Sequence, residues 1–204
     1  MENLAELSVF SALLAGITLS AASGLRVFLP MLALGLSARM GWLEVGEQFA
    51  WLASDPVLMV VGVAALLEAG AYYIPLVDNL LDLVATPAAM AGGTVIVSAL
   101  LPEMNEFAQW STALTLGGGS AGLVQGSTVL LRGASTAGSG GLGNSLVTTG
   151  ETGGSLLLIV MALVVPILAG ILVIAALVWL LSKLLRWLFA RSRVNSPEDP
   201  TAPG

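Results

Sequence analysis

The residues of this sequence that could do chemistry are a few acids, a tyrosine and two arginines set among long uncharged stretches. Glu68 and Tyr72 are four residues apart, so on a helix they share a face and the phenol could hydrogen-bond the carboxyl group. A bare carboxylate inside lipid is costly, so Glu68 must be protonated, paired or hydrated. Two interpretations follow: an acid that binds a proton or a cation, or a structural acid neutralised by Arg26 or Arg132.

Asp78 and Asp82 repeat the four-residue spacing a little further along the chain. With Glu68 they could form an acidic mouth for cations. They also stand where a helix is expected to begin, and a carboxylate at an N-cap or in the first turn is favoured by the free N–H groups and the helix dipole. Both interpretations remain open.

The candidate basic and neutral polar residues are Arg26, Arg132 and Gln125. An arginine inside the membrane usually binds a carboxylate, a carbonyl or a lipid phosphate. A buried glutamine either lines a path or hydrogen-bonds a neighbouring helix. We therefore expect these three residues to lie near a polar path with Glu68, or to serve the fold, the arginines by neutralising Glu68 and Gln125 by hydrogen-bonding a neighbouring helix.

Several chemistries are excluded by the residue inventory, because the chain has no histidine and no cysteine. This removes Cys-based zinc and iron–sulfur sites, haem held by His or Cys, disulfides, Cys nucleophiles and the Ser-His-Asp triad. The only lysine, Lys183, lies near the C-terminus, where it cannot serve a Ser-Lys dyad in the membrane. The G-x-G-x-x-G match at 138–143 lacks the strand, helix and distant acid of a dinucleotide site. We expect no enzyme, no cofactor and no metal site.

Composition gives the class of protein that must position these residues. The chain of 204 residues is 56% hydrophobic and 10% charged, and its mean hydropathy is +0.93. Soluble domains carry about 25% charged residues. A net charge of −6 argues against a nucleic-acid partner, which needs a basic face. The sequence predicts an all-α, polytopic transmembrane helix bundle in a lipid bilayer.

About six membrane segments are expected, because a spanning helix needs about 20 mostly apolar residues. The second segment is short and could instead be re-entrant. A Gly-, Ser- and Thr-rich loop is expected at 133–155. A single transmembrane domain would cover 1–190, followed by a disordered tail at 191–204. The expected helices are 4–22, 25–41, 55–74, 78–101, 107–132 and 154–190.

Two weaker patterns concern internal organisation. A few identities recur at an offset of 98 residues, which would make 1–98 and 99–190 repeated halves of the kind found in transporters. Gly118, Gly122 and Gly126 form a row of small residues, and such rows let helices approach closely. Packing is the favoured role of this row, within the chain or in a homo-oligomer.

Orientation follows from the positive charges, four of which come after the last apolar stretch: Lys183, Arg186, Arg191 and Arg193. Cytoplasmic flanks are enriched in Lys and Arg. We expect a multi-pass protein of a bacterial inner membrane with a cytoplasmic C-terminus. Six spans would place the N-terminus inside as well, whereas a re-entrant second segment would place it outside.

A resemblance adds to this interpretation. The segment 68–82, Glu-Ala-Gly-Ala-Tyr-Tyr-Ile-Pro-Leu-Val-Asp-Asn-Leu-Leu-Asp, resembles the signature of an uncharacterised bacterial membrane family, domain-of-unknown-function family 4126. Ala91-Gly92 and the runs 132–136 and 140–144 are similar to it as well. Tyr72 and Tyr73 replace the Asp and Lys typical of that family, and Ala88-Ala89 replace an Arg-Pro pair, so the chain resembles a divergent branch. The resemblance implies the membrane fold. It assigns no activity.

The leading hypothesis is a small transporter or channel-like protein that moves a small solute or cation by means of intramembrane carboxylates, with Glu68 as the titrating group. The alternative is a non-catalytic scaffold or lipid-binding protein whose buried charges are structural ion pairs and whose glycine rows mediate assembly.

Overall fold

The computed structural model describes residues 2–72, 75–139 and 143–194, and these are helical almost throughout, with no strand among them. This confirms the all-α class. The elements, in order, are α1 (Glu2–Ser23), α2 (Phe28–Arg39), a 3-10 helix η1 (Glu47–Ala53), α3 (Asp55–Ala71), α4 (Pro75–Leu100), α5 (Glu106–Ala113), a π-helix η2 (Leu114–Gly118), α6 (Gly119–Ser139), α7 (Asn144–Val164) and α8 (Pro166–Val194).

Local sequence explains several helix boundaries. Pro56 stands in the first turn of α3, where its missing N–H has no helical partner to lose. Asn105 caps α5 by accepting the N–H of Ala108 at 2.9 Å. The π-helix leaves the carbonyl of Gly117 available, and Ser20 Oγ of α1 donates to it at 2.6 Å. The irregular turn is therefore held by a neighbouring helix.

Two expectations about the second half are wrong. Residues 133–155 are not a loop, because α6 continues to Ser139 and α7 begins at Asn144. The expected helix 154–190 is two helices, because Val165 leaves helical geometry (φ −137°, ψ 59°) and Pro166 starts the next one. Small and hydroxyl residues indicate loops in soluble proteins, but in a membrane bundle they also line the interior of close-packed helices.

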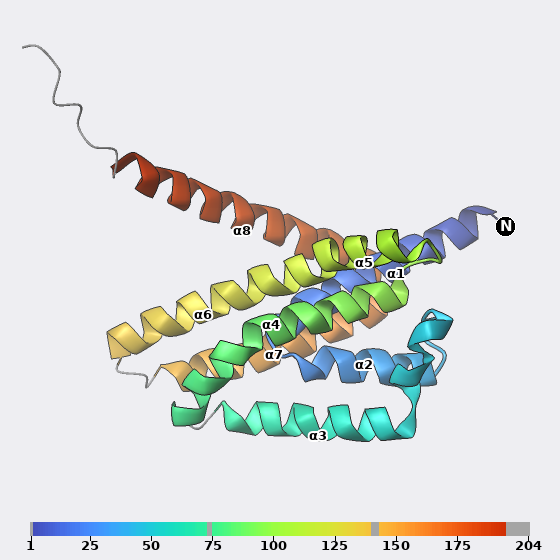
Figure 1. Cartoon of the computed structure of the whole chain (residues 1–204), viewed down its shortest axis with the longest axis horizontal. Coiled ribbons are helices and arrows are strands. Elements are labelled where there is room, and N and C mark those ends of the chain that lie inside the picture. The colour runs from blue at the N-terminus through green and yellow to red at the C-terminus, as the bar shows by residue number, and fades with distance from the viewer. Residues whose placement is uncertain (1, 73–74, 140–142, 195–204) are drawn as a thin grey trace, which may run out of the picture.

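The helices form one bundle with α1 running through its interior (Figure 1). α1 packs against α4, α7 and α8, and Leu19, Leu34 and Ile96 belong to one buried apolar cluster. The closest crossing joins α4 to η2, where a Cβ added to Gly117 would lie 2.2 Å from the carbonyl oxygen of Gly93. Only glycine permits this approach of two backbones.

The glycine row of α6 and η2 faces α4 only in part. A Cβ on Gly118 would lie 2.8 Å from Thr94 Oγ1, and one on Gly122 would lie 3.1 Å from Met90 Cγ. A Cβ on Gly126 would meet nothing within 4 Å. Gly118 and Gly122 therefore provide close packing within the chain, while Gly126 does not.

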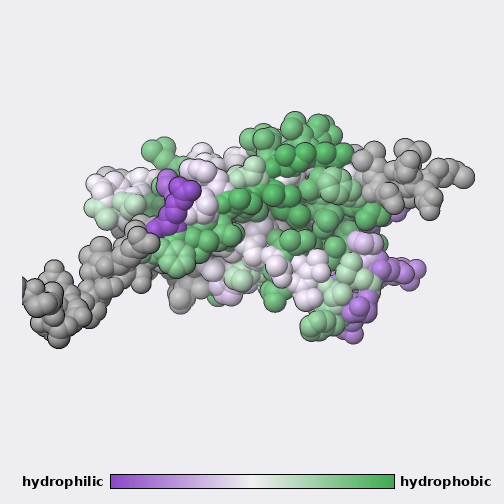
Figure 2. All heavy atoms as spheres, turned by 90° about the horizontal axis from the view of Figure 1, so that it is seen from above, coloured by the Kyte–Doolittle hydropathy of each residue, from purple (hydrophilic) through white to green (hydrophobic). Residues whose placement is uncertain are grey.

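Six spans are not confirmed. Two helical stretches of the described chain are long and apolar enough to cross a bilayer, Asn144–Val164 and Pro166–Arg186. A third span results if η1 and α3, bent by 60° at their junction, are counted together. Shorter apolar helices are Ser8–Ser23, Phe28–Arg39 and Val84–Leu100. Figure 2 shows hydrophobic side chains over the middle of one face, with strongly hydrophilic residues toward its two ends, so the chain is compatible with a membrane protein.

The second segment is shorter than expected and lies inside the bundle. α2 has 12 residues, a length of about 18 Å at 1.5 Å per residue, which is less than the apolar core of a bilayer. It begins after a non-helical turn at 24–27 that separates it from α1. Its N-terminus is buried, since Val27 is 6% exposed and its N–H donates to Glu68 of α3. Figure 1 also shows the N-terminus and the end of α8 at opposite ends of the molecule.

Candidate functional site

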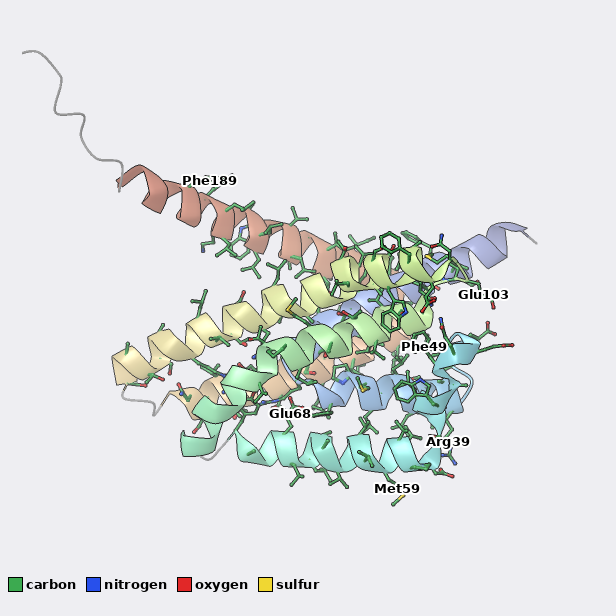
Figure 3. All side chains as sticks on the ribbon, viewed as in Figure 1. Arg39, Phe49, Met59, Glu68, Glu103 and Phe189 are labelled. Atoms are coloured by element: carbon green, nitrogen blue, oxygen red, sulfur yellow. The ribbon has the colours of Figure 1, made fainter. Side chains whose placement is uncertain are left out.

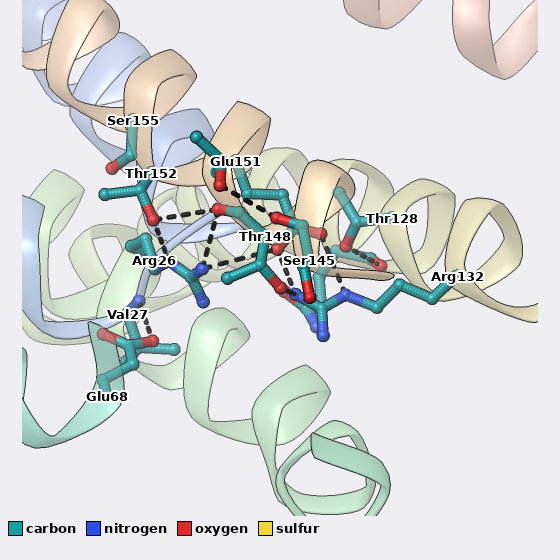
Figure 4. A network of polar contacts seen from close by, with 12 residues as sticks. Arg26, Val27, Glu68, Thr128, Arg132, Ser145, Thr148, Glu151, Thr152 and Ser155 are labelled. Carbon is teal, nitrogen blue, oxygen red and sulfur yellow. Dashed lines mark hydrogen bonds and ion pairs between the residues drawn. The ribbon is translucent and has the colours of Figure 1, made fainter. Parts of the chain in front are cut away.

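A cluster of buried charges lies beside the N-terminus of α2. Arg26 comes from the break between α1 and α2, Glu68 and Tyr72 from the end of α3, Arg132 from α6 and Glu151 from α7. All five are buried, with exposed fractions of 8% or less. The structure thus brings together four of the sequence-predicted site residues and adds one, Glu151. Figure 4 shows the charged members of this cluster.

Arg26 is the most deeply buried charge, with 1% of the residue exposed. Its Nε donates to Thr152 Oγ1 at 3.0 Å and its Nη2 to the carbonyl of Thr148 at 3.0 Å. The carboxylate of Glu151 lies 3.8 Å from Nη2, beyond hydrogen-bond distance. Nη1 has no hydrogen-bond partner among the residues that the structure describes. Both of its hydrogen bonds to the described residues therefore go to neutral oxygens on α7.

Arg132 and Glu151 form a two-pronged ion pair. Arg132 Nε donates to Glu151 Oε1 at 3.0 Å, and Arg132 Nη2 donates to Glu151 Oε2. Nη2 also lies 3.5 Å from Thr148 Oγ1. Bidentate pairing of this kind is the strongest arginine–carboxylate geometry. Glu151 is therefore neutralised chiefly by Arg132 and only at longer range by Arg26.

Glu68 caps the buried start of α2. Its Oε1 accepts the N–H of Val27 at 2.8 Å, and its Oε2 accepts the N–H of Phe28 at 3.1 Å. The first N–H groups of a helix have no intrahelical partner, and the helix dipole favours a negative charge there. Figure 3 shows Glu68 on α3 beside α2. The carboxylate is thus held by backbone donors, which is a structural partner set that neither sequence interpretation included.

Tyr72 lies against both guanidinium groups. The Cζ of Arg26 is 4.4 Å from the centre of the ring and the Cζ of Arg132 is 4.3 Å from it. Both distances suit cation–π attraction, which is stronger in a desolvated site. The aromatic ring therefore joins the end of α3 to the two arginines.

The remaining predicted residues are less closely involved. Gln125 is buried on α6, where its backbone N–H would lie 3.0 Å from a Cβ added to Gly24. Asp78 and Asp82 belong to the first turns of α4, and their side chains lie outside the described part of the structure. Groups of three or more acids, His or Cys that could hold a metal ion do not occur among the described residues.

Glu151 was missed because it fell in the expected loop. A signal for it was present, since Thr148, Glu151, Thr152 and Ser155 follow the spacing i, i+3, i+4, i+7 of one helix face. In the structure this polar stripe faces the bundle: Thr148 and Ser155 are fully buried, and Ser155 Oγ donates to the carbonyl of Ala22 at 3.3 Å. Periodicity, rather than composition, would have identified the helix.

A hollow of about 340 Å³ adjoins the cluster between α2, α3 and α4. Glu68 and Tyr72 contribute to its wall, which is otherwise apolar; the other lining residues include Val27, Phe28, Leu67, Val84, Ala85 and Ala88. Leu67 and Val84 are exposed on the outside of the bundle, so the hollow opens sideways. Its inner wall is shared with the charged cluster through Tyr72.

A second hollow of about 560 Å³ lies at the other end of the bundle. It is lined by the 41–46 turn, the start of α1 and the end of α4. No buried charged residue belongs to its lining. The first hollow is therefore the one connected with the candidate site.

A family model described as Domain of unknown function (DUF4126) matches residues 13–187, so the chain belongs to this family. The matched range includes every residue of the charged cluster. No curated protein and no solved structure matches the chain.

Proposed function

We propose that this member of the DUF4126 family is a small transporter or channel-like membrane protein that passes a small solute or ion along the cluster of Arg26, Tyr72 and Arg132. The observation that carries the proposal is a pair of guanidinium groups buried inside an apolar bundle, one of which keeps a donor without a partner among the described residues. Ionisable groups at membrane depth are costly and usually serve a path or a binding site.

The broken first hairpin supports this function. The α1–α2 break places the N-terminus of a short helix beside the charged cluster. Many transporters build their sites from discontinuous helices whose N-termini point at the substrate. Here Glu68 occupies that position, so its role in the proposal is to position α2 rather than to carry the solute.

The proposed orientation places the C-terminus in the cytoplasm of a bacterial cell and the N-terminus outside. The exposed end of α8 carries Lys183 and Arg186, whereas the opposite end carries the exposed acids Glu44, Glu47 and Glu103. The excess of positive charge marks the cytoplasmic side. Single cysteines at positions 42 and 186 should be labelled from opposite sides of the membrane by an impermeant thiol reagent; labelling from one side would contradict this orientation.

Water access to the cluster tests the transport proposal directly. The chain has no cysteine of its own, so single cysteines replace Thr128 and Thr152, which neighbour the charges, and Ile96, which is buried in the apolar core, as a matched control. An impermeant thiol reagent should label positions 128 and 152 and spare position 96. Protection of all three, in folded protein that is labelled at position 42, would contradict a polar path. Labelling justifies flux assays in proteoliposomes.

A specific observation favours the scaffold as a second candidate function. Both carboxylates of the cluster are engaged by protein donors, Glu68 by the start of α2 and Glu151 by Arg132. Such pairs can serve the fold alone. If Arg132→Gln and Glu151→Gln disturb only folding or assembly, and the protein carries no flux in liposomes, the scaffold function is favoured.

A further inference from the structure

We propose that the hollow between α2, α3 and α4 binds an amphiphilic anion from the lipid phase, with its apolar body in the hollow and its carboxylate or phosphate head on Arg26 Nη1. This inference rests on the proposed function, because it names the class of molecule for the same site. The donor concerned, Arg26 Nη1, has no hydrogen-bond partner among the described residues of the cluster.

The Nη1 atom of Arg26 has no acceptor among the residues that the structure describes. Its side chain is fully buried, and a buried donor without a partner is unfavourable. The nearby carboxylates cannot supply the acceptor in this arrangement, since Glu68 binds Val27 and Phe28 and Glu151 binds Arg132. Figure 4 shows one terminal nitrogen of Arg26 turned away from the contacts to α7. The partner it needs is therefore an oxygen from outside the described residues.

The contacts of Arg26 favour a negative oxygen. Both of its hydrogen bonds go to neutral oxygens, Thr152 Oγ1 and the Thr148 carbonyl, and Glu151 stays 3.8 Å away. Arg132, in contrast, already has a carboxylate in bidentate contact. Charge-assisted hydrogen bonds are stronger than neutral ones. A carboxylate or phosphate head is thus a better complement to Arg26 than a hydroxyl group.

The hollow favours an apolar body behind that head. Its volume of about 340 Å³ is within the range of small-molecule sites, and most of its lining is apolar. It opens between Leu67 and Val84, which are exposed on the faces of α3 and α4. In a membrane this opening faces lipid, so an amphiphile can enter where a hydrated ion cannot.

Tyr72 connects the two halves of the proposed site. The residue lines the hollow, and its ring centre is 4.4 Å from Arg26 Cζ. Arg26 itself is not among the lining residues, so the ring of Tyr72 separates the hollow from the guanidinium. In the proposed complex the acidic head passes this ring to reach Nη1, while the apolar body stays in the hollow.

The test is equilibrium dialysis of radiolabelled octanoate against the whole protein in nanodiscs of neutral lipid, with empty nanodiscs subtracted. Octanol carries the same chain without the charge, and acetate and inorganic phosphate carry charge without the chain. We expect saturable binding of octanoate and at least tenfold weaker binding of the other three. Equal binding of octanol would overturn the anionic head, and equal binding of acetate or phosphate would overturn the amphiphile.

Variants separate the two parts of the site. Arg26→Gln should weaken octanoate binding at least tenfold, and Ala88→Phe, which fills the hollow and leaves every charge in place, should do the same. Arg39→Gln, at an exposed arginine of the other end, is the matched control and should bind as the original chain does. If Arg26→Gln does not fold, Ala88→Phe alone decides: a folded variant with unchanged binding overturns the proposal.

The outcomes for this inference and for transport are distinguishable. Octanoate binding without labelling at positions 128 and 152 or flux would support the binding site and contradict the transporter. Labelling and flux of another solute without octanoate binding would support the transporter and overturn the amphiphile.

Discussion

The contact between Glu68 and the start of α2 leads to the sharpest prediction, the effect of Glu68→Gln. The carboxylate accepts two backbone N–H groups, from Val27 at 2.8 Å and from Phe28 at 3.1 Å. The amide of glutamine keeps one acceptor oxygen and turns an NH2 group toward the other donor. The substitution therefore removes one charge-assisted hydrogen bond, weakens the second and removes the negative charge from the helix N-terminus.

The expected loss of stability follows from these contacts. A hydrogen bond to a charged group contributes about 1.5–3 kcal/mol, and a charge at a helix end contributes about 0.3–1 kcal/mol. Together they predict a decrease of about 2–4 kcal/mol in the free energy of unfolding for Glu68→Gln. The matched control is Glu103→Gln, at an exposed acid of the α4–α5 turn, where a change within about 0.5 kcal/mol is expected.

Two assays test this prediction. Tryptophan fluorescence during SDS titration in mixed micelles gives the free energy of unfolding. Hydrogen exchange of the peptide containing residues 27 and 28 shows whether those N–H groups lose protection, which the control should not change. If Glu68→Gln unfolds within 0.5 kcal/mol of the original chain and leaves exchange at 27–28 unchanged, the capping role is refuted. Loss of flux with unchanged stability would instead support Glu68 as a titrating acid.

Two further pairs of substitutions test the packing of the site. Arg132→Gln and Glu151→Gln should each lower stability by about 3–5 kcal/mol, because each breaks a buried bidentate ion pair; the double variant should lose clearly less than the sum, and additive losses in the SDS titration would contradict the pair. Gly24→Ala should cost about 1–3 kcal/mol, because its Cβ would lie 2.4 Å from the carbonyl oxygen of Ala121. Gly126→Ala, with open space around its Cβ, is the control and should gain up to about 1 kcal/mol; equal melting temperatures of the two variants would refute the close approach.

The class of the protein and many helix boundaries could be predicted because they depend on local signals. Pro56 and Asn105 mark helix starts through the geometry of the first turn, and the apolar composition indicates the membrane. The break between α7 and α8 could not be inferred from hydropathy, since the chain is apolar on both sides of Pro166. The start of α7 was hidden by glycine, serine and threonine, whose meaning depends on whether the helix faces water or other helices.

Most members of the candidate site could be identified, but their pairing could not. The cost of charge at depth singles out Arg26, Glu68 and Arg132 from the sequence. Which acid pairs with which base depends on how the helices cross. The crossings are fixed by contacts between residues far apart in the sequence, such as that between Gly24 and α6. Pairing of Glu68 with an arginine was one of two open interpretations, and the structure has a helix cap in its place. The partner of Arg132, Glu151, comes from a segment expected to be a loop. The predicted repeat of 1–98 and 99–190 stays a prediction.

The break at 24–27 explains why these features occur together. Ending α1 inside the bundle creates a buried helix N-terminus, which needs an acceptor, and Glu68 provides it from α3. The same break carries Arg26 into the interior, which requires acceptors from a neighbouring helix, and α7 provides Thr148 and Thr152. A continuous helix through 24–27 would satisfy its own backbone and need neither set. The break therefore requires polar groups inside the bundle, which a purely structural bundle could avoid. Among the described residues Arg26 Nη1 has no hydrogen-bond partner, so the fold itself does not use this donor.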